Sequence, residues 1–156
     1  MANALGNMGN VCHQQGELGR ALEFYEQAYD VAERLGDPRM MAGQLGNIGN
    51  VYRRQGELGR ALECYQQAYA VSERLKDPEI MAIALASMGL IYAQQGDLEK
   101  ARQHLEQAQT LYQAVGIKGE GPDTVAHALE ALEEIEKALA LTSEQEPPTR
   151  RKSKQS

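Results

Sequence analysis

The most informative segment of the chain is residues 43–78, with the sequence GQLGNIGNVYRRQGELGRALECYQQAYAVSERLKDP. Residues 3–38 carry the same pattern 40 positions earlier, and 25 of the 36 aligned residues are identical. A third, more divergent copy follows, in which Gly89, Gly96 and Ala101 occupy matching positions. A fixed period of this length is typical of stacked repeats, in which each unit buries its apolar face on its neighbours.

Each copy predicts a pair of helices. In the second copy, Asp37 and Pro38 suit a helix start, because Asp caps free backbone N–H groups and Pro fits the first helical position. Gly56 suits the end of that helix, where a left-handed residue is favoured, and Glu57 suits the start of the next. No segment alternates with period two, so no strand is predicted. The second helix carries an apolar stripe at 3.6-residue spacing, formed by Leu58, Ala61, Leu62, Tyr65, Ala68, Tyr69 and Leu75.

These residues resemble the tetratricopeptide (TPR) pattern of a large residue, Leu-Gly and Tyr, followed by Ala, an aromatic residue and a second Ala. The period of 40 residues departs from the family's usual ~34, and we expect the extra residues to lengthen the second helix and the loop after it. Long repeats that contain Leu-Gly-Asn, as at residues 45–47, are similar to those of Pins/LGN adaptors and bacterial TPR signalling proteins. The second copy carries the pattern at Leu45, Ile48, Gly49, Tyr52, Ala61, Tyr65 and Ala68.

The resemblance implies an all-α fold, an α-solenoid of three two-helix repeats closed by a C-terminal capping helix. We expect the capping helix at residues 123–141, with Val125, Leu129, Leu132, Ile135 and Leu139 covering the last repeat. A basic, Pro-containing tail follows, for which disorder is predicted. The expected divisions are repeats at 1–38, 39–76 and 77–116, a loop with the capping helix at 117–141, and the tail at 142–156.

Glycine is unexpectedly frequent in the predicted helices, where each Gly costs about 1 kcal/mol relative to Ala. We expect Gly49 and Ala61 to let two helix backbones approach closely, which would offset this cost. The chain has only two Cys in 156 residues, which favours a reducing, cytoplasmic location over a disulfide scaffold. No segment has the ~20 apolar residues that a membrane span requires.

No catalytic constellation emerges from the sequence. The three His residues, His13, His104 and His127, and the two Cys residues lack metal-ligand spacing. Lys118 lies in a Gly-containing loop without the Walker arrangement. The net charge of −6 disfavours indiscriminate binding to nucleic acid. We therefore predict a non-enzyme with no cofactor, no metal ion, no small-molecule substrate, and no nucleic-acid or membrane partner.

Charge is distributed unevenly among the predicted helices. The first helices carry three basic residues against one acidic residue, whereas the second helices carry six against eleven. In TPR proteins the first helices line the concave surface, so the resemblance implies a neutral-to-basic groove inside an acidic shell. The expected groove residues, by family position, are Asn7, Asn10, His13, Gln14, Asn47, Asn50, Arg53, Arg54, Ile83, Ser87, Leu90 and Gln94.

These positions favour a protein-interaction scaffold that binds a peptide segment with an acidic residue beside an apolar one. In the alternative without a binding role, Arg53 and Arg54 pair with neighbouring Glu residues or stay solvated, and Asn10 and Asn50 form hydrogen bonds locally. A second hypothesis is a structural or self-assembly module, because repeat one begins without a cap and leaves an apolar face open at which the chain can form a homo-oligomer. The chain can equally be a fragment of a larger TPR regulator.

Overall fold

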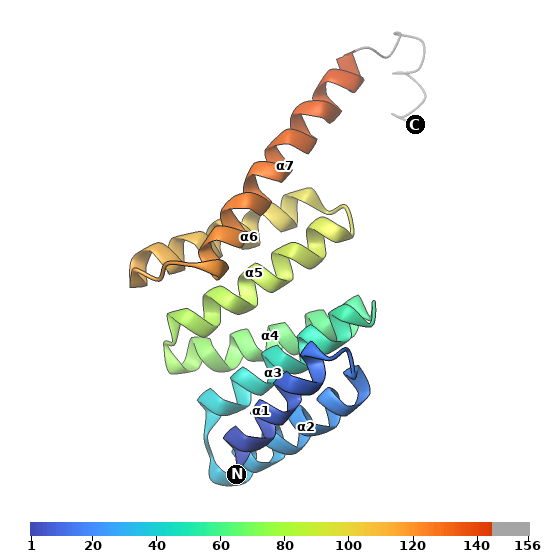
Figure 1. The fold of residues 1–156 in the computed structure, drawn as a ribbon. Helices are drawn as coiled ribbons and strands as arrows, with labels where there is room; N and C mark the ends of the chain where they lie inside the picture. The colour runs from blue at the N-terminus through green and yellow to red at the C-terminus, as the bar shows by residue number, and fades with distance from the viewer. Residues whose placement is uncertain (145–156) are drawn as a thin grey trace, which may run out of the picture.

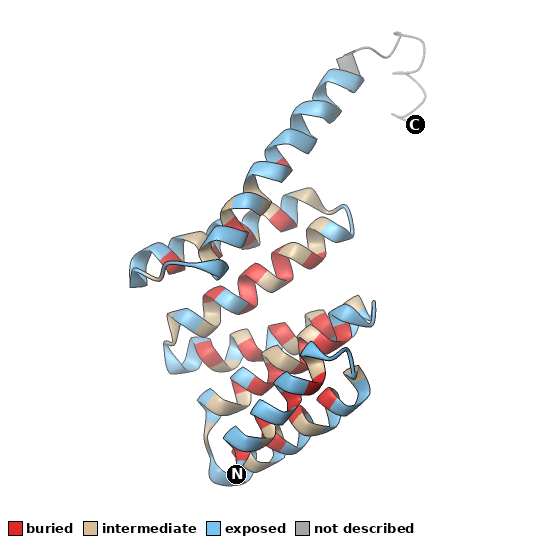
Figure 2. Cartoon of the chain, in the orientation of Figure 1, coloured by how far each residue is buried: buried red, intermediate tan, exposed pale blue. Residues whose placement is uncertain are grey.

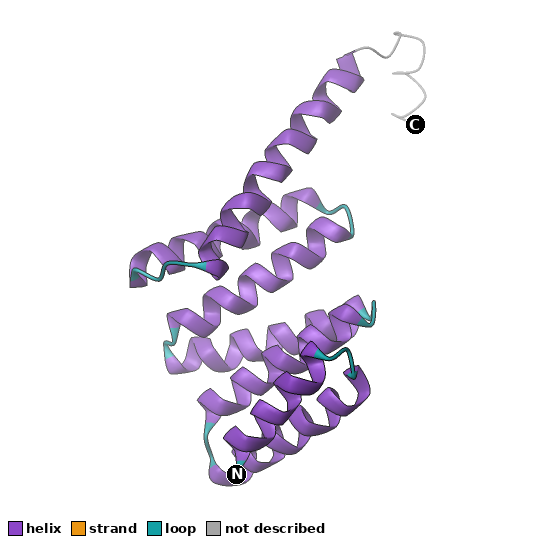
Figure 3. Cartoon of the chain, viewed as in Figure 1, coloured by secondary structure: helices purple, strands orange, loops and turns teal. Residues whose placement is uncertain are grey.

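The computed structural model describes residues 1–144, in which seven helices and no strand occur. Helices α1/α2, α3/α4 and α5/α6 form three pairs that stack in chain order, and α7 follows the last pair (Figures 1 and 3). This arrangement is the all-α solenoid expected from the repeats. The helices are α1 (Ala2–Gln14), α2 (Leu18–Leu35), α3 (Pro38–Arg54), α4 (Leu58–Leu75), α5 (Pro78–Gln94), α6 (Leu98–Val115) and α7 (Glu120–Glu144).

The first helices begin and end at the residues that the sequence indicates. The Asp37 carboxylate accepts a hydrogen bond from the backbone N–H of Met40 at 3.0 Å, and Asp77 caps α5 in the same way. Gly56 has a φ of +79°, which glycine adopts without the steric cost that a Cβ imposes. The helix boundaries predicted from Asp-Pro and Gly are therefore confirmed.

Most residues of each repeat belong to its two helices. Helix α3 has 17 residues and α4 has 18. Between α2 and α3 the chain has only Gly36 and Asp37 outside the helices. The expectation of a longer loop after the second helix is therefore wrong. The second helix continues to a left-handed residue, and the Asp that caps the next helix follows at once, so no room is left for a loop.

One glycine in each first helix, at positions 9, 49 and 89, accommodates a side chain from the second helix of its pair. A Cβ atom placed on Gly49 would lie 2.8 Å from Cε1 of Tyr65, and one placed on Gly9 would lie 2.5 Å from Cε1 of Tyr25. The atoms nearest to Gly49 thus belong to the Tyr65 ring, a contact that the sequence did not predict, while at the equivalent Gly89 a Cβ would also lie 3.2 Å from the backbone oxygen of Ala101, the counterpart of Ala61. The tight fit offsets the low helix propensity of Gly.

Helix α7 covers the third repeat with only its first half. Val125 and Leu132 are buried, whereas Ile135 is 45% exposed and Leu139 is 55% exposed (Figure 2). The expectation that Ile135 and Leu139 also cover the last repeat is therefore wrong.

The sequence explains why α7 projects beyond the stack. Glu136 stands where Gly16, Gly56 and Gly96 end the first helices of the three repeats, so the helix continues past this position to Glu144. Glu136 also forms an ion pair of 2.7 Å with Arg102 of α6. The expected disordered tail begins at residue 142, but residues 142–144 belong to α7. The rest of the expected tail, residues 145–156, lies outside the described residues.

The first helices lie along one side of the stack. Beyond the contacts between consecutive helices, α3 contacts α5 and α5 contacts α7. Among residues 1–144, no helix combines the length and the apolar character needed to cross a bilayer.

Candidate functional site: a groove along the first helices

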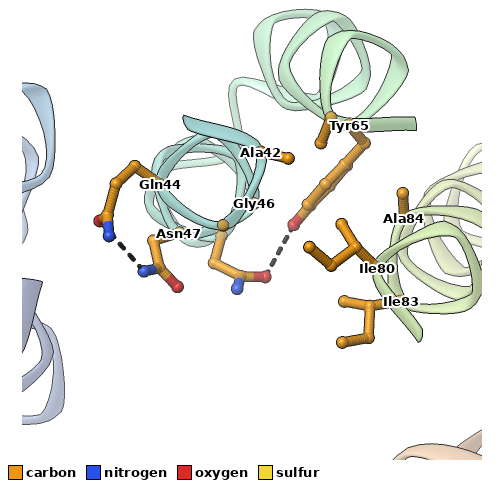
Figure 4. Close-up of a pocket in the computed structure, with 11 residues that line it drawn as sticks. Ala42, Gln44, Gly46, Asn47, Tyr65, Ile80, Ile83 and Ala84 are labelled. Carbon is orange, nitrogen blue, oxygen red and sulfur yellow. Dashed lines mark hydrogen bonds between the residues drawn. The ribbon is translucent and has the colours of Figure 1, made fainter. Parts of the chain in front are cut away.

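Two adjoining pockets form a groove on the first-helix side, and Asn50 and Ile83 line both. In the pocket between α3 and α5, Tyr65 extends from α4 with its ring beside Ile80 and its hydroxyl directed at Asn50 (Figure 4). The pocket between α5 and α7 adds Ser87 and Leu90 to the lining. The groove therefore combines an apolar floor with a small number of polar groups, as ligand sites commonly do.

Asn50 is held in place by Tyr65. The Tyr65 hydroxyl donates a hydrogen bond of 2.7 Å to Oδ1 of Asn50, and Tyr25 binds Asn10 with the same length. The alternative that these Asn residues bond locally is therefore correct for the oxygen atom. The amide has two N–H donors besides this oxygen, so the bond orients the group without using its donors.

Arg53 and Ser87 lie close to the Tyr65 hydroxyl. Burial raises the pKa of Tyr65, while the charge of Arg53 and hydrogen bonding with Arg53 and Ser87 oppose that rise. Arg53 is exposed and forms no ion pair with an acidic residue of the described chain. Together with Asn50, these side chains bring a cation and three hydrogen-bonding groups from α3, α4 and α5 to one place.

Arg54 has a different position from Arg53. Its Nη1 donates a hydrogen bond of 2.6 Å to the backbone oxygen of His13 at the end of α1. Burial lowers the pKa of His13, and the charges of Arg54 and Arg53 lower it further. The predicted cationic centre is thus divided: Arg54 binds the neighbouring repeat, and Arg53 lies near the Tyr65 hydroxyl.

The remaining predicted site residues are scattered. Asn47 lines the α3/α5 pocket and donates a hydrogen bond of 3.4 Å to Gln44. Asn7 lines a separate pocket at the N-terminal end, beside Met8 and Val11. Six further predicted residues line neither groove pocket: Asn10, His13, Gln14, Arg53, Arg54 and Gln94.

Sequence reasoning missed Tyr65 as a groove residue because it assigned Tyr65 to the apolar stripe. A signal was available in the repeats. Where the first helix has Asn, the second helix has Tyr fifteen residues later in the chain, and where it has Leu90 the second helix has Leu105. The paired change indicates that the two side chains meet.

The groove offers binding groups and no evident reactive group. Among residues 1–144, no cluster of three His, Cys, Asp or Glu side chains is placed to hold a metal ion. Burial raises the pKa of the Cys64 thiol, which disfavours the reactive thiolate.

Known structures share this fold at low sequence identity. The chain superposes with BtubC from P. vanneervenii at a TM-score of 0.67 and 18% identity, covering 94% of this chain and 66% of BtubC. It superposes with the TPR2AB domain of yeast Sti1, solved in complex with pHSP90, at 0.79 and 17% identity, covering 99% and 54%. The first TPR domain of Spaghetti, bound to the HSP90 peptide SRMEEVD, gives 0.64 and 22%, covering 89% and 93%.

No curated protein gives a significant match to the sequence. The chain spans just under two thirds of BtubC and about half of the Sti1 domain. Residues 2–153 match the family described as the MalT-like TPR region. Since this match covers nearly the whole sequence and the helix pairs stack as its repeats predict, the chain belongs to the MalT-like TPR family.

Proposed function

We propose that the chain is a protein-interaction scaffold whose groove binds a peptide segment with an acidic residue beside an apolar one. The observation that carries this proposal is the cluster of Arg53, Asn50 and Ser87 around the Tyr65 hydroxyl, next to an apolar floor formed by Ile83 and Leu90. A guanidinium group binds a carboxylate through two parallel hydrogen bonds, and an oriented amide suits a peptide backbone.

The solved neighbours support a binding role for this fold. The Spaghetti domain is bound to SRMEEVD, a peptide with two Glu residues followed by Val, and the Sti1 domain is in complex with pHSP90. The resemblance concerns the fold, so the acidic preference proposed for this chain depends on its own Arg53. The two free cysteines, Cys12 and Cys64, suit the reducing cytoplasm that we propose as its location.

The test is a binding screen on an array of short peptides in which one acidic and one apolar position are varied. We expect the wild-type chain to retain peptides that carry both residues, and Arg53→Glu to weaken that binding at least about tenfold. Arg74→Glu is the matched control, because it makes the same charge change at an exposed residue. Arg74 lies in the last turn of α4, and no residue of that turn lines a groove pocket.

Circular dichroism should show equal helicity for both variants, since neither arginine is buried. Equal loss of binding in the two variants would mean that net charge alone causes the loss. Retention of acidic peptides by Arg53→Glu would contradict the proposal.

The second candidate function is self-assembly through the N-terminal face. Val11 on α1 is 51% exposed, whereas its equivalents Val51 and Ile91 are fully buried. An exposed apolar face of this kind suits association with a second copy. The expected result is a molar mass that rises with concentration in light scattering, and a constant monomer mass would contradict it.

A further inference from the structure

The outer face of α1 is equivalent to a surface that accepts a helix in the other repeats. Met8 is 48% exposed, whereas Ile48 is 8% and Met88 is 4% exposed at the same repeat position. Helices α3 and α5 differ from α1 in having a preceding helix, α2 or α4, packed against them. The exposed face of α1 is formed by Met8 and Val11 and is called here the α1 face; no helix within residues 1–144 covers it.

The opposite end of the molecule carries an apolar helix surface that no other helix among residues 1–144 covers. Ile135 and Leu139 continue the stripe that Val125 and Leu132 begin, and they lie on the half of α7 that extends away from the stack (Figure 1). An amphipathic helix gains most of its stability by packing this stripe against another element. The stripe at Ile135 and Leu139 is called here the α7 stripe.

We propose that the α7 stripe of one copy packs on the α1 face of the next copy, in a head-to-tail contact. The inference rests on the second candidate function, self-assembly, and specifies the surfaces that meet. On the α1 face, the bound helix occupies the place that α2 occupies on α3 and that α4 occupies on α5. Both unpaired surfaces are present once per chain, so each copy offers one of each.

Charge favours this pairing over a symmetric one through α7. Helix α1 contains no Asp, Glu, Lys or Arg. The projecting half of α7 carries Glu133, Glu134 and Glu136 against Lys137. Two α7 stripes facing each other would bring like charges together, whereas the uncharged α1 face imposes no such repulsion.

The geometry determines the kind of assembly. The α1 face and the α7 stripe lie at opposite ends of the molecule (Figure 1), so a contact between them leaves one free surface at each end of a dimer. A heterologous contact that does not close on itself adds further copies. The α7 stripe is short, so the contact is small and the association reversible.

Sedimentation velocity on the full chain tests the pairing through mixed variants. Val11→Glu blocks the α1 face, and Ile135→Glu with Leu139→Glu blocks the α7 stripe. We expect wild-type species to grow beyond dimers with concentration and each variant alone to stay monomeric. An equimolar mixture should form dimers and nothing larger, because each variant retains one functional surface.

The controls separate the possible failures. Glu130→Gln, an exposed position on the other side of α7, should associate as the wild type does. Val11→Ser serves as a milder variant if Val11→Glu loses helicity. If the α7 variants associate normally while Val11→Glu does not, the copies pair through α1 alone: the inference is then wrong and self-assembly stands. A wild-type chain that is monomeric throughout contradicts both.

Discussion

Helices α1 and α3 are near-copies in sequence that differ in their surroundings. Val11 and Val51 occupy the same repeat position, yet one is half exposed and the other is fully buried. The difference teaches that burial in a repeat array is set by the neighbouring unit as much as by the residue. The same substitution made at both positions should therefore separate folding from association.

The largest expected effect is on Val51. Val51→Asp places an unpaired carboxylate in a fully buried position, which should cost about 4 kcal/mol or more in the free energy of unfolding. Val11→Asp should change it by less than about 0.5 kcal/mol, because Val11 faces solvent. Urea denaturation followed by circular dichroism at low protein concentration measures both. Equal losses would mean that the α1 face is covered in the monomer.

Two glycines of α3 sharpen the same comparison within one helix. Gly49→Leu should destabilise the chain by about 1 to 3 kcal/mol, because its side chain would overlap the Tyr65 ring. Gly46→Ala should stabilise it by roughly 0.5 to 1 kcal/mol, because a Cβ there meets nothing within 4 Å and Ala is the better helix former. Thermal melting distinguishes the two, and a stabilising Gly49→Leu would contradict the observed packing.

The sequence predicted the solenoid because the repeats combine several independent signals that agree. Asp-Pro starts, glycine ends and apolar stripes all recur at one period, and local signals of this kind need no knowledge of distant contacts. It did not predict that the Tyr65 ring lies against Gly49, because the direction of a side chain on the second helix does not follow from the repeat pattern alone.

The site was less predictable than the fold. Asn50, Ile83 and Leu90, named from family positions, line the pockets because register along a helix follows from the repeat, and their role in binding stays a prediction. The family positions placed Arg53 and Arg54 together, although adjacent residues on a helix point in different directions, and Arg54 binds the end of α1. Which of two neighbouring arginines faces a ligand depends on the packing of the adjacent repeat.

The hydrogen bond between Tyr65 and Asn50 offers a smaller effect to measure. Tyr65→Phe should lower the free energy of unfolding by about 1 kcal/mol, since it leaves the Asn50 oxygen without its partner. Tyr25→Phe should have a similar effect in the first repeat, where Asn10 is the acceptor. A double-mutant cycle with Asn50→Leu measures the coupling, and a coupling near zero would contradict the bond.

The smallest expected effect concerns position 13, where the first repeat has His and the second has Arg53. The pKa of His13 lies below its ordinary value of 6.5 because burial and the charges of Arg54 and Arg53 disfavour the imidazolium. The unfolded chain therefore binds the proton more readily than the folded chain. The contribution of His13 to stability is fully present above pH 6.5 and declines as the pH falls from there toward the folded-state pKa.

The unfolding free energies of the wild type and of His13→Gln should consequently diverge in that pH window, with the wild type losing more stability. NMR titration of the His13 ring should give a pKa below that of an unfolded peptide. Parallel curves, or a raised pKa, would show that the imidazole is not buried beside Arg54 and Arg53 in solution.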